Sequence, residues 1–280
     1  GCNHRCTFCI IPYGRGNSRS VPVGKIVEQI KQLAAHGFNE VVITGVDITD
    51  YGLDLPGKPS LGQMLKRLFN LVPEIPRIRL SSIDVAEVDD ELIELIKYEP
   101  RLMSHFHISL QAGDNMILKR MKRRHNREQV IEFVKQVQKC RPFASFGADI
   151  IAGFPTETDE MFANSLRLVE EANLSLLHIF PYSERAGTPA AKIPTAKQVP
   201  VNIRKKRAKL LRQAGEQQLT QLATKFIGQE INVLVEKDDM ARSEEFLYVK
   251  LPKPSIAGSI IKVKIDKVDN QQLIAGKIYV

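Results

Sequence analysis

Helical and extended apolar patterns alternate along the first two thirds of the chain. Residues 23–36 carry apolar side chains on one helical face (Ile26, Ile30, Leu33), and residues 40–44 (EVVIT) then form a short apolar run. The same order predicts four more helix and strand pairs: 61–71 and 78–82, 90–97 and 106–110, 126–139 and 144–151, 157–172 and 174–180. Five such pairs predict a parallel α/β sheet, because each parallel crossover needs a connecting helix.

After residue 228 the pattern changes to the two-residue alternation that is typical of strands. The segments concerned are 230–236, 246–251, 259–267 and 272–280. Four short strands separated by turn residues predict a small antiparallel β-barrel, an architecture that often binds oligonucleotides. We therefore predict an α/β core over residues 1–200, a basic helical linker over 201–225 and a β-barrel over 226–280.

Charge and composition narrow the class of partner. The 280 residues include 40 Lys and Arg against 32 Asp and Glu, a formal net charge of +8. This excess favours contact with a polyanion, of which nucleic acid is the first candidate. The sequence shows no apolar run of membrane-spanning length, so we expect a cytoplasmic protein without membrane contact.

Three of the four cysteines lie within the first nine residues. Cys2, Cys6 and Cys9 have the spacing C-x3-C-x2-C, whereas Cys140 is isolated. Three thiolates are one fewer than a closed zinc site or a fully protein-bound cubane needs. A [4Fe-4S] cluster held by three cysteines leaves one iron open to a small molecule such as S-adenosylmethionine (SAM). The alternative is a zinc site that is completed by His4 or by a distant ligand.

The cysteine loop and four later motifs resemble the radical SAM methylthiotransferase family, and within it the threonylcarbamoyladenosine-tRNA branch. These are residues 1–22 (GCNHRCTFCIIPYGRGNSRSVP), 44–52 (TGVDITDYG), 109–122 (SLQAGDNMILKRMK), 149–158 (DIIAGFPTET) and 180–190 (FPYSERAGTPA). The last fifth of the chain resembles the RNA-binding TRAM domain. The family usually has glycine where Thr156 stands, which puts that turn in doubt.

The resemblance implies a partial (βα)6 TIM-like barrel whose first strand precedes Gly1, followed by a TRAM-like barrel. It implies addition of a methylthio group to C2 of N6-threonylcarbamoyladenosine beside the tRNA anticodon. The implied cofactors are SAM, the [4Fe-4S] cluster of the cysteine loop, and a second [4Fe-4S] cluster in an amino-terminal domain upstream of Gly1. We also expect an electron donor and a monomer. Alternatives are modification of isopentenyladenosine or of a ribosomal-protein aspartate, and a non-catalytic zinc- and RNA-binding module.

Six residues besides the cysteines are candidates for binding SAM: Phe8, Gly45, Asp47, Ser82, Gln111 and Gly153. The resemblance implies that the backbone at Gly45, together with Asp47, meets the methionine ammonium group, although Asp47 can equally be a turn residue. Ser82 and Gln111 stand at strand ends and are candidates for the ribose or carboxylate. Gly153 would allow close approach of adenine. Phe8 is either an adenine contact or an apolar plug.

Basic residues provide candidates for RNA contact. Arg15 and Arg19 follow the cysteine loop, and two basic runs cover residues 119–127 and 204–212. The candidates in these runs are Arg123, Arg124, Arg204, Lys205 and Lys206. Such runs are often only solvated helix faces. Beside an oligonucleotide-binding barrel, however, they favour phosphate contact and salt-sensitive binding.

Overall fold

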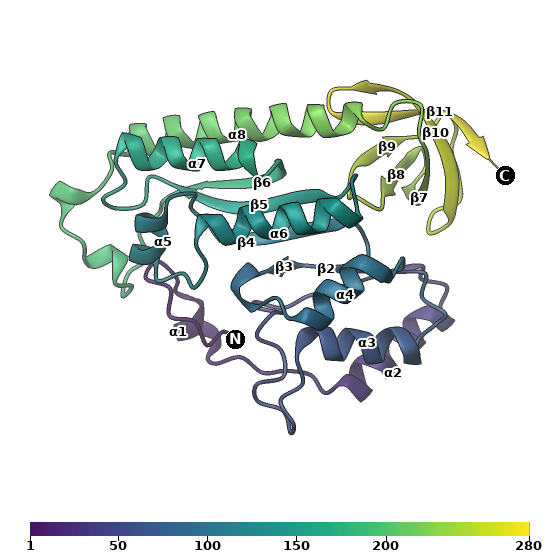
Figure 1. The fold of residues 1–280 in the computed structure, drawn as a ribbon, viewed down its shortest axis with the longest axis horizontal. Helices are drawn as coiled ribbons and strands as arrows, with labels where there is room; N and C mark the ends of the chain where they lie inside the picture. Colours follow the sequence, from purple (N-terminus) through teal and green to yellow (C-terminus); the bar gives the residue numbers. More distant parts are fainter. Residues whose placement is uncertain (280) are drawn as a thin grey trace.

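The computed structural model describes residues 1–279, and its parallel strands form two groups (Figure 1). The first group pairs β1 (Glu40–Ile43) with β2 (Arg77–Leu80). The second contains, in spatial order, β3 (Ser82–Ile83), β4 (His105–Gln111), β5 (Ser145–Ala152) and β6 (Leu174–Pro181). The expectation of a parallel α/β sheet is therefore confirmed. The single strand predicted over 78–82 is wrong, because the chain breaks at Ser81, whose N–H donates to the Ile43 carbonyl.

Five helices occur where the apolar pattern predicted them: α2 (Val23–Ala35), α3 (Leu61–Leu71), α4 (Asp90–Tyr98), α6 (Arg127–Cys140) and α7 (Asp159–Glu171). Their starts follow local chemistry, since Ser60 and Asn126 each form a reciprocal capping box with the glutamine three residues later. Two further helices, α1 (Ile11–Arg15) and α5 (Asn115–Met121), were not predicted. They are too short to show a helical period.

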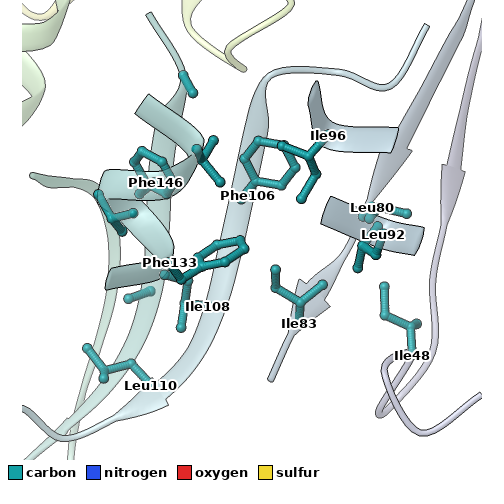
Figure 2. Packing of buried hydrophobic residues seen from close by; sticks show 14 of the residues in the cluster. Ile48, Leu80, Ile83, Leu92, Ile96, Phe106, Ile108, Leu110, Phe133 and Phe146 are labelled. Atoms are coloured by element: carbon teal, nitrogen blue, oxygen red, sulfur yellow. The ribbon is translucent and has the colours of Figure 1, made fainter. Parts of the chain in front are cut away.

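The main core lies between the helices and one face of the strands (Figure 2). Phe106 on β4, Phe133 on α6 and Phe146 on β5 pack together, and the first two rings meet edge to face with their centroids 6.3 Å apart. This arrangement combines burial of large apolar surface with favourable ring geometry. Because side chains alternate along a strand, His105 and His107 point to the opposite face from Phe106.

The last part of the chain forms a closed five-stranded barrel with strand order β10-β11-β9-β8-β7. The strands are β7 (Glu230–Lys237), β8 (Met240–Ser243), β9 (Tyr248–Lys250), β10 (Ile260–Asp269) and β11 (Gln272–Tyr279). The predicted small β-barrel is confirmed, but the expectation of four antiparallel strands is wrong in two respects. The short strand β8 was missed, and β9 pairs with β11 in parallel. Val280, the predicted end of the last strand, lies outside the described residues.

Helix α8 (Val201–Thr224) lies along the sheet and leads into the barrel (Figure 1). Its residues Ala208 and Leu211 belong to the main core, whereas Leu222 and Ala223 belong to the core of the barrel. The segment is helical, as expected, but it is more than a linker. The division into domains at 200 and 225 stays a prediction.

The barrel contacts the amino-terminal ends of the parallel strands. His105, the first residue of β4, stacks on Phe246 with ring centroids 5.1 Å apart, and Ser145, the first residue of β5, donates to the Glu245 carbonyl. The carboxyl ends, where α/β folds place their ligand sites, therefore lie at the other end of the sheet.

Candidate radical SAM active site

The cysteine loop lies at the carboxyl ends of the parallel strands. The Cys2 Sγ atom is 3.9 Å from Oδ2 of Asp47, which is in the loop after β1. Thr7 fixes the other part of the loop, because its N–H donates to the Met121 carbonyl (3.0 Å) and its hydroxyl to the Arg120 carbonyl (2.8 Å) at the end of α5. Contacts from the loop after β1 and from the end of α5 thus hold the cysteines over one end of the sheet.

The donor set of the loop fits an iron-sulfur cluster. All three thiols are free, with Cys6 buried and Cys2 and Cys9 half-buried. Burial raises the pKa of Cys9, and the charge of the neighbouring Cys6 thiolate raises it further. Three soft thiolates close enough to repel one another are stabilised by binding a thiophilic metal or an iron-sulfur cluster. Cys2, Cys6 and Cys9 would therefore hold a [4Fe-4S] cluster that keeps one iron for a small molecule.

His4 and Arg123 surround Cys6 with positive charge. Burial acts to raise the pKa of Cys6, but a hydrogen bond with His4 and the charge of Arg123, whose Nη1 is 3.4 Å from Sγ, lower it below its ordinary value. The bond with Cys6, helped by Glu87, raises the pKa of His4 to about 10. His4 therefore acts as a hydrogen-bond partner of the loop, and its Nε2 lies 3.1 Å from Glu87 Oε1. The donor atoms of Cys2, His4 and Asp47 also lie within 4.8 Å of one another, so this geometry is compatible with the zinc alternative that uses His4 as well.

Arg123 is itself held by a buried network that the sequence did not reveal. Its Nη2 donates to Asp84 Oδ2 (2.8 Å) and to the Ser109 carbonyl (2.7 Å). His125 Nδ1 lies 3.0 Å from the other carboxylate oxygen, and its Nε2 lies 3.1 Å from the Leu110 carbonyl. The one sequence feature that could have indicated this network is Asp84, a charged residue directly after the apolar residue that ends β3. The network links the sheet to the cluster loop.

A cleft of about 850 Å³ opens beside the cysteine loop, and Gly45, Asp47, Arg15 and Arg19 line it together with Gly1. Burial raises the pKa of Asp47, and the Glu87 charge adds to this rise, while Thr49 donates to its Oδ1 (3.0 Å). Asp47 also lies 3.3 Å from His4 Nε2, so an ammonium group placed here would share this carboxylate with His4. The structure thus brings four predicted residues together at one cleft.

Residues 1–169 match the Radical SAM superfamily, which is 60% of the chain. The chain belongs to this superfamily. It is 61% identical over 265 residues to a threonylcarbamoyladenosine tRNA methylthiotransferase MtaB of Rickettsia prowazekii, covering 95% of this chain and 62% of that protein. It is 34% identical to a tRNA-2-methylthio-N(6)-dimethylallyladenosine synthase of Bacillus pumilus, covering 98% of this chain and 55% of the relative. This radical SAM chain therefore spans about three fifths of the curated relatives that it matches.

Solved structures show the same fold at low identity. Coproporphyrinogen III oxidase (HemN) from Escherichia coli, described as a radical SAM enzyme, matches with a TM-score of 0.52 and 17% identity, covering 95% of this chain and 65% of that chain. The methyltransferase TsrM from Kitasatospora setae, with cobalamin and a [4Fe-4S] cluster bound, matches with a TM-score of 0.55 and 15% identity, covering 68% and 34%. Among the described residues, no helix has the length and apolar character needed to cross a membrane.

The remaining predicted SAM contacts occupy different settings in the radical SAM core. Ser82 begins β3, where it pairs with His107, and Gln111 ends β4 with a φ of 74°. Gly153 follows β5, and a Cβ atom there would lie 2.5 Å from Arg204 Cγ, so a packed side chain already explains this glycine. Phe8 packs partly buried against a small apolar cluster, as the plug interpretation expected. Binding of SAM by these four residues stays a prediction.

Two predicted RNA contacts are wrong. The side chains of Arg123 and Arg204 are only 7% and 8% exposed, and Arg204 donates to the Tyr182 carbonyl (3.0 Å). Each arginine points into the protein from a run of basic residues. The number of charges in such a run does not show which side chains are buried and which are exposed. Lys205 and Lys206 are exposed, as are Arg15, Arg19 and Arg124, of which Arg124 pairs with Glu87.

Thr156 marks a real departure in the turn after β5. Its φ is 73°, a left-handed conformation that glycine adopts more easily. Its N–H donates to the Lys197 carbonyl (2.8 Å), and its hydroxyl accepts a hydrogen bond from Arg120 Nη1 (2.7 Å). These two hydrogen bonds offset the backbone strain at Thr156, so β5 and the turn after it form although glycine is absent from this position.

Proposed function

We propose that this chain is the radical SAM core of a methylthiotransferase that modifies C2 of N6-threonylcarbamoyladenosine next to the tRNA anticodon. The carrying observation is the three-cysteine loop with Asp47 beside it, at the carboxyl ends of the strands. Relatives that match 95% of this chain, at up to 61% identity, are named threonylcarbamoyladenosine tRNA methylthiotransferases. We thus propose both the reaction, methylthiolation, and the substrate, N6-threonylcarbamoyladenosine in tRNA.

In this proposal the chain's own residues bind and orient the cofactors. Cys2, Cys6 and Cys9 would hold the cluster, and Asp47 would face the ammonium group of SAM bound beside it. When bound and reduced, the cluster supplies the electron that cleaves the SAM sulfonium. Arg123 and His4 stabilise the negative charge at Cys6. A second [4Fe-4S] cluster, which donates sulfur, and an electron donor complete the proposed system.

The position of the barrel supports a folded RNA as the substrate. Strand β5 has eight residues, so the amino and carboxyl ends of the sheet are roughly 25 Å apart at about 3.3 Å per residue. A molecule that touches both the barrel and the cysteine loop must span at least this distance. A tRNA does so, whereas a free nucleoside does not. Lys205 and Lys206 offer exposed cations in the first turns of α8, next to Arg204, whose side chain packs at the carboxyl ends of β5 and β6.

The second candidate function is modification of dimethylallyladenosine in tRNA, since relatives at 34% identity carry that name. Nucleoside analysis by mass spectrometry of tRNA from a strain in which the gene encoding this sequence is disrupted separates the two. Loss of 2-methylthio-N6-threonylcarbamoyladenosine supports the proposal. Loss of the dimethylallyl product, or of a modified ribosomal-protein aspartate, contradicts it.

The cofactor half of the proposal has its own test. After anaerobic reconstitution with iron and sulfide, we expect a brown chain whose broad visible absorption bleaches on reduction and which cleaves SAM. A Cys6→Ser variant should lose the colour, whereas Cys140→Ser, an exposed thiol, should keep it. A colourless wild-type chain with stoichiometric zinc bound through sulfur would indicate the zinc- and RNA-binding alternative.

A further inference from the structure

Two histidines and one aspartate converge on the sheet face opposite the main core. His107 Nε2 and His178 Nδ1 each lie 3.1 Å from Oδ1 of Asp149, and all three donor atoms are within 4.8 Å of one another. The residues come from the adjacent strands β4, β5 and β6, where Asp149 is directly paired with His178. We propose that this trio is a second metal site, which binds a divalent transition-metal ion such as zinc independently of the cysteine loop.

The backbone is shaped around the first ligand. His107 lies beside Gly147, where a Cβ atom would come within 2.4 Å of its Nδ1 atom. Only glycine leaves room for the ring in this orientation, which directs Nε2 toward Asp149. The His107 ring is further fixed by the His178 ring, with centroids 4.8 Å apart. The strand pairing, rather than a flexible loop, therefore sets the positions of the donors.

The carboxylate of Asp149 supplies the negative charge of the trio. Its Oδ1 atom lies 3.1 Å from both His107 Nε2 and His178 Nδ1. Glu216 and Arg212 of α8 line the same cavity with opposite charges. A bound divalent cation would therefore meet one carboxylate together with two imidazole nitrogens.

The trio opens to a cavity of about 270 Å³ that both histidines line. His178 is 65% exposed, whereas His107 is 12% exposed, so an ion can enter from the His178 side. Two imidazole nitrogens and one carboxylate oxygen are ligands that zinc and similar borderline ions prefer, and three protein ligands leave a position for water. Magnesium, which prefers oxygen ligands, is a poorer match.

The site is separate from the cysteine loop in both position and chemistry. His107 precedes Gln111, the carboxyl end of β4, by four residues, which is roughly 13 Å along the strand at about 3.3 Å per residue. Its ligands are nitrogen and oxygen, whereas the loop offers sulfur. Spectroscopy can therefore distinguish the two sites in one sample, and the outcome is independent of the proposed tRNA specificity.

The test uses the reconstituted chain with its iron-sulfur cluster in place, in a Cys140→Ser background, dialysed against micromolar zinc. We expect one zinc per chain, with X-ray absorption showing only nitrogen and oxygen ligands at about 2.0–2.1 Å. Asp149→Asn and His178→Gln should each weaken zinc binding at least tenfold. The control is His36→Gln, since His36 is exposed on the end of α2 and lies far from the trio in sequence.

Three results would overturn the proposal. They are the absence of bound zinc at micromolar concentration, zinc bound through sulfur at about 2.3 Å, and unchanged binding in both ligand variants. Because the His178 side chain is mostly exposed, His178→Gln should keep the circular dichroism spectrum of the parent chain. Loss of zinc in that variant therefore reports on the site and not on misfolding.

Discussion

Replacing Asp84 by asparagine tests how the buried network behind the cysteine loop contributes to stability. Asp84 is 3% exposed, and Asn keeps its shape while removing the charge that compensates Arg123. Breaking a buried ion pair on one side costs about 3–5 kcal/mol, and we expect the lower end because Asn still accepts one hydrogen bond. If the free energy of unfolding falls by about 3 kcal/mol per molar urea, the urea concentration at the unfolding midpoint should be about 1 M lower in the variant than in wild type.

The sign of the pH dependence follows from the same contacts. Burial acts to raise the pKa of Asp84, but the His125 hydrogen bond and the Arg123 charge outweigh it, so the pKa is lowered in the folded chain. Its contribution is therefore complete above the unfolded pKa of about 4 and is lost as the pH falls further. The difference in midpoint between wild type and Asp84→Asn should be constant from pH 7 to 5 and shrink near pH 3.5.

Urea titrations followed by circular dichroism at these three pH values provide the measurement. Glu132→Gln, an exposed change on α6, is the matched control and should leave the midpoint unchanged. An Asp84→Asn midpoint equal to that of wild type would show that Arg123 does not need its partner. A difference that instead grows as the pH falls from 7 to 3.5 would refute the assigned direction of the pKa, because a raised pKa would make wild type gain stability on protonation.

Three further expectations concern other parts of the chain. Gly153→Ala should lower the free energy of unfolding by about 2 kcal/mol or more, because it adds a clash with the Arg204 side chain to an unfavourable φ of 75°. The control Gly187→Ala, with a φ of 86° and open space around it, should lower it by only about 1 kcal/mol. Equal urea midpoints for the two variants would refute the clash. Glu157 is buried and accepts a hydrogen bond from Arg207 (2.7 Å), but burial outweighs the Arg207 charge and raises the pKa of Glu157 to about 7. Wild type should therefore lose up to about 3 kcal/mol of unfolding free energy relative to Glu157→Gln as the pH rises from 5 to 8, measured by urea unfolding; a constant difference would contradict this. Lys205→Ala/Lys206→Ala should weaken tRNA binding and reduce the slope of log affinity against log salt by up to about 1.5, whereas an unchanged slope would show that neither lysine meets phosphate.

The apolar pattern predicted the helices and parallel strands well, because both periodicities are local properties of the sequence. It failed at Ser81, where a hydrogen bond to a distant strand divides one apolar run between two sheets. It also missed β8, whose sequence Met-Ala-Arg-Ser lacks alternation and is extended only because two neighbouring strands pair with it. These features depend on tertiary pairing.

In the candidate site, too, local sequence features could be predicted and contacts made by the fold could not. The spacing of Cys2, Cys6 and Cys9 was readable because three ligands lie within one short segment. The contact of Arg123 with Cys6, and that of Asp84 with Arg123, could not be predicted from the sequence, since these residues are distant in sequence and are brought together only by the fold. Arg123 was assigned to RNA because a run of basic residues gives no information about which side of a helix or loop is buried.

Helix α8 belongs to the hydrophobic cores of both the sheet and the barrel, so neither part can be removed without exposing apolar residues of the other. The same helix supplies Leu211 to the core of the sheet and Leu222 to the core of the barrel. Truncation at residue 225 would therefore uncover apolar surface at the end of α8 and invite aggregation. Loss of RNA binding in such a truncated protein would be uninterpretable, so the contribution of the barrel has to be measured with surface substitutions in the intact chain.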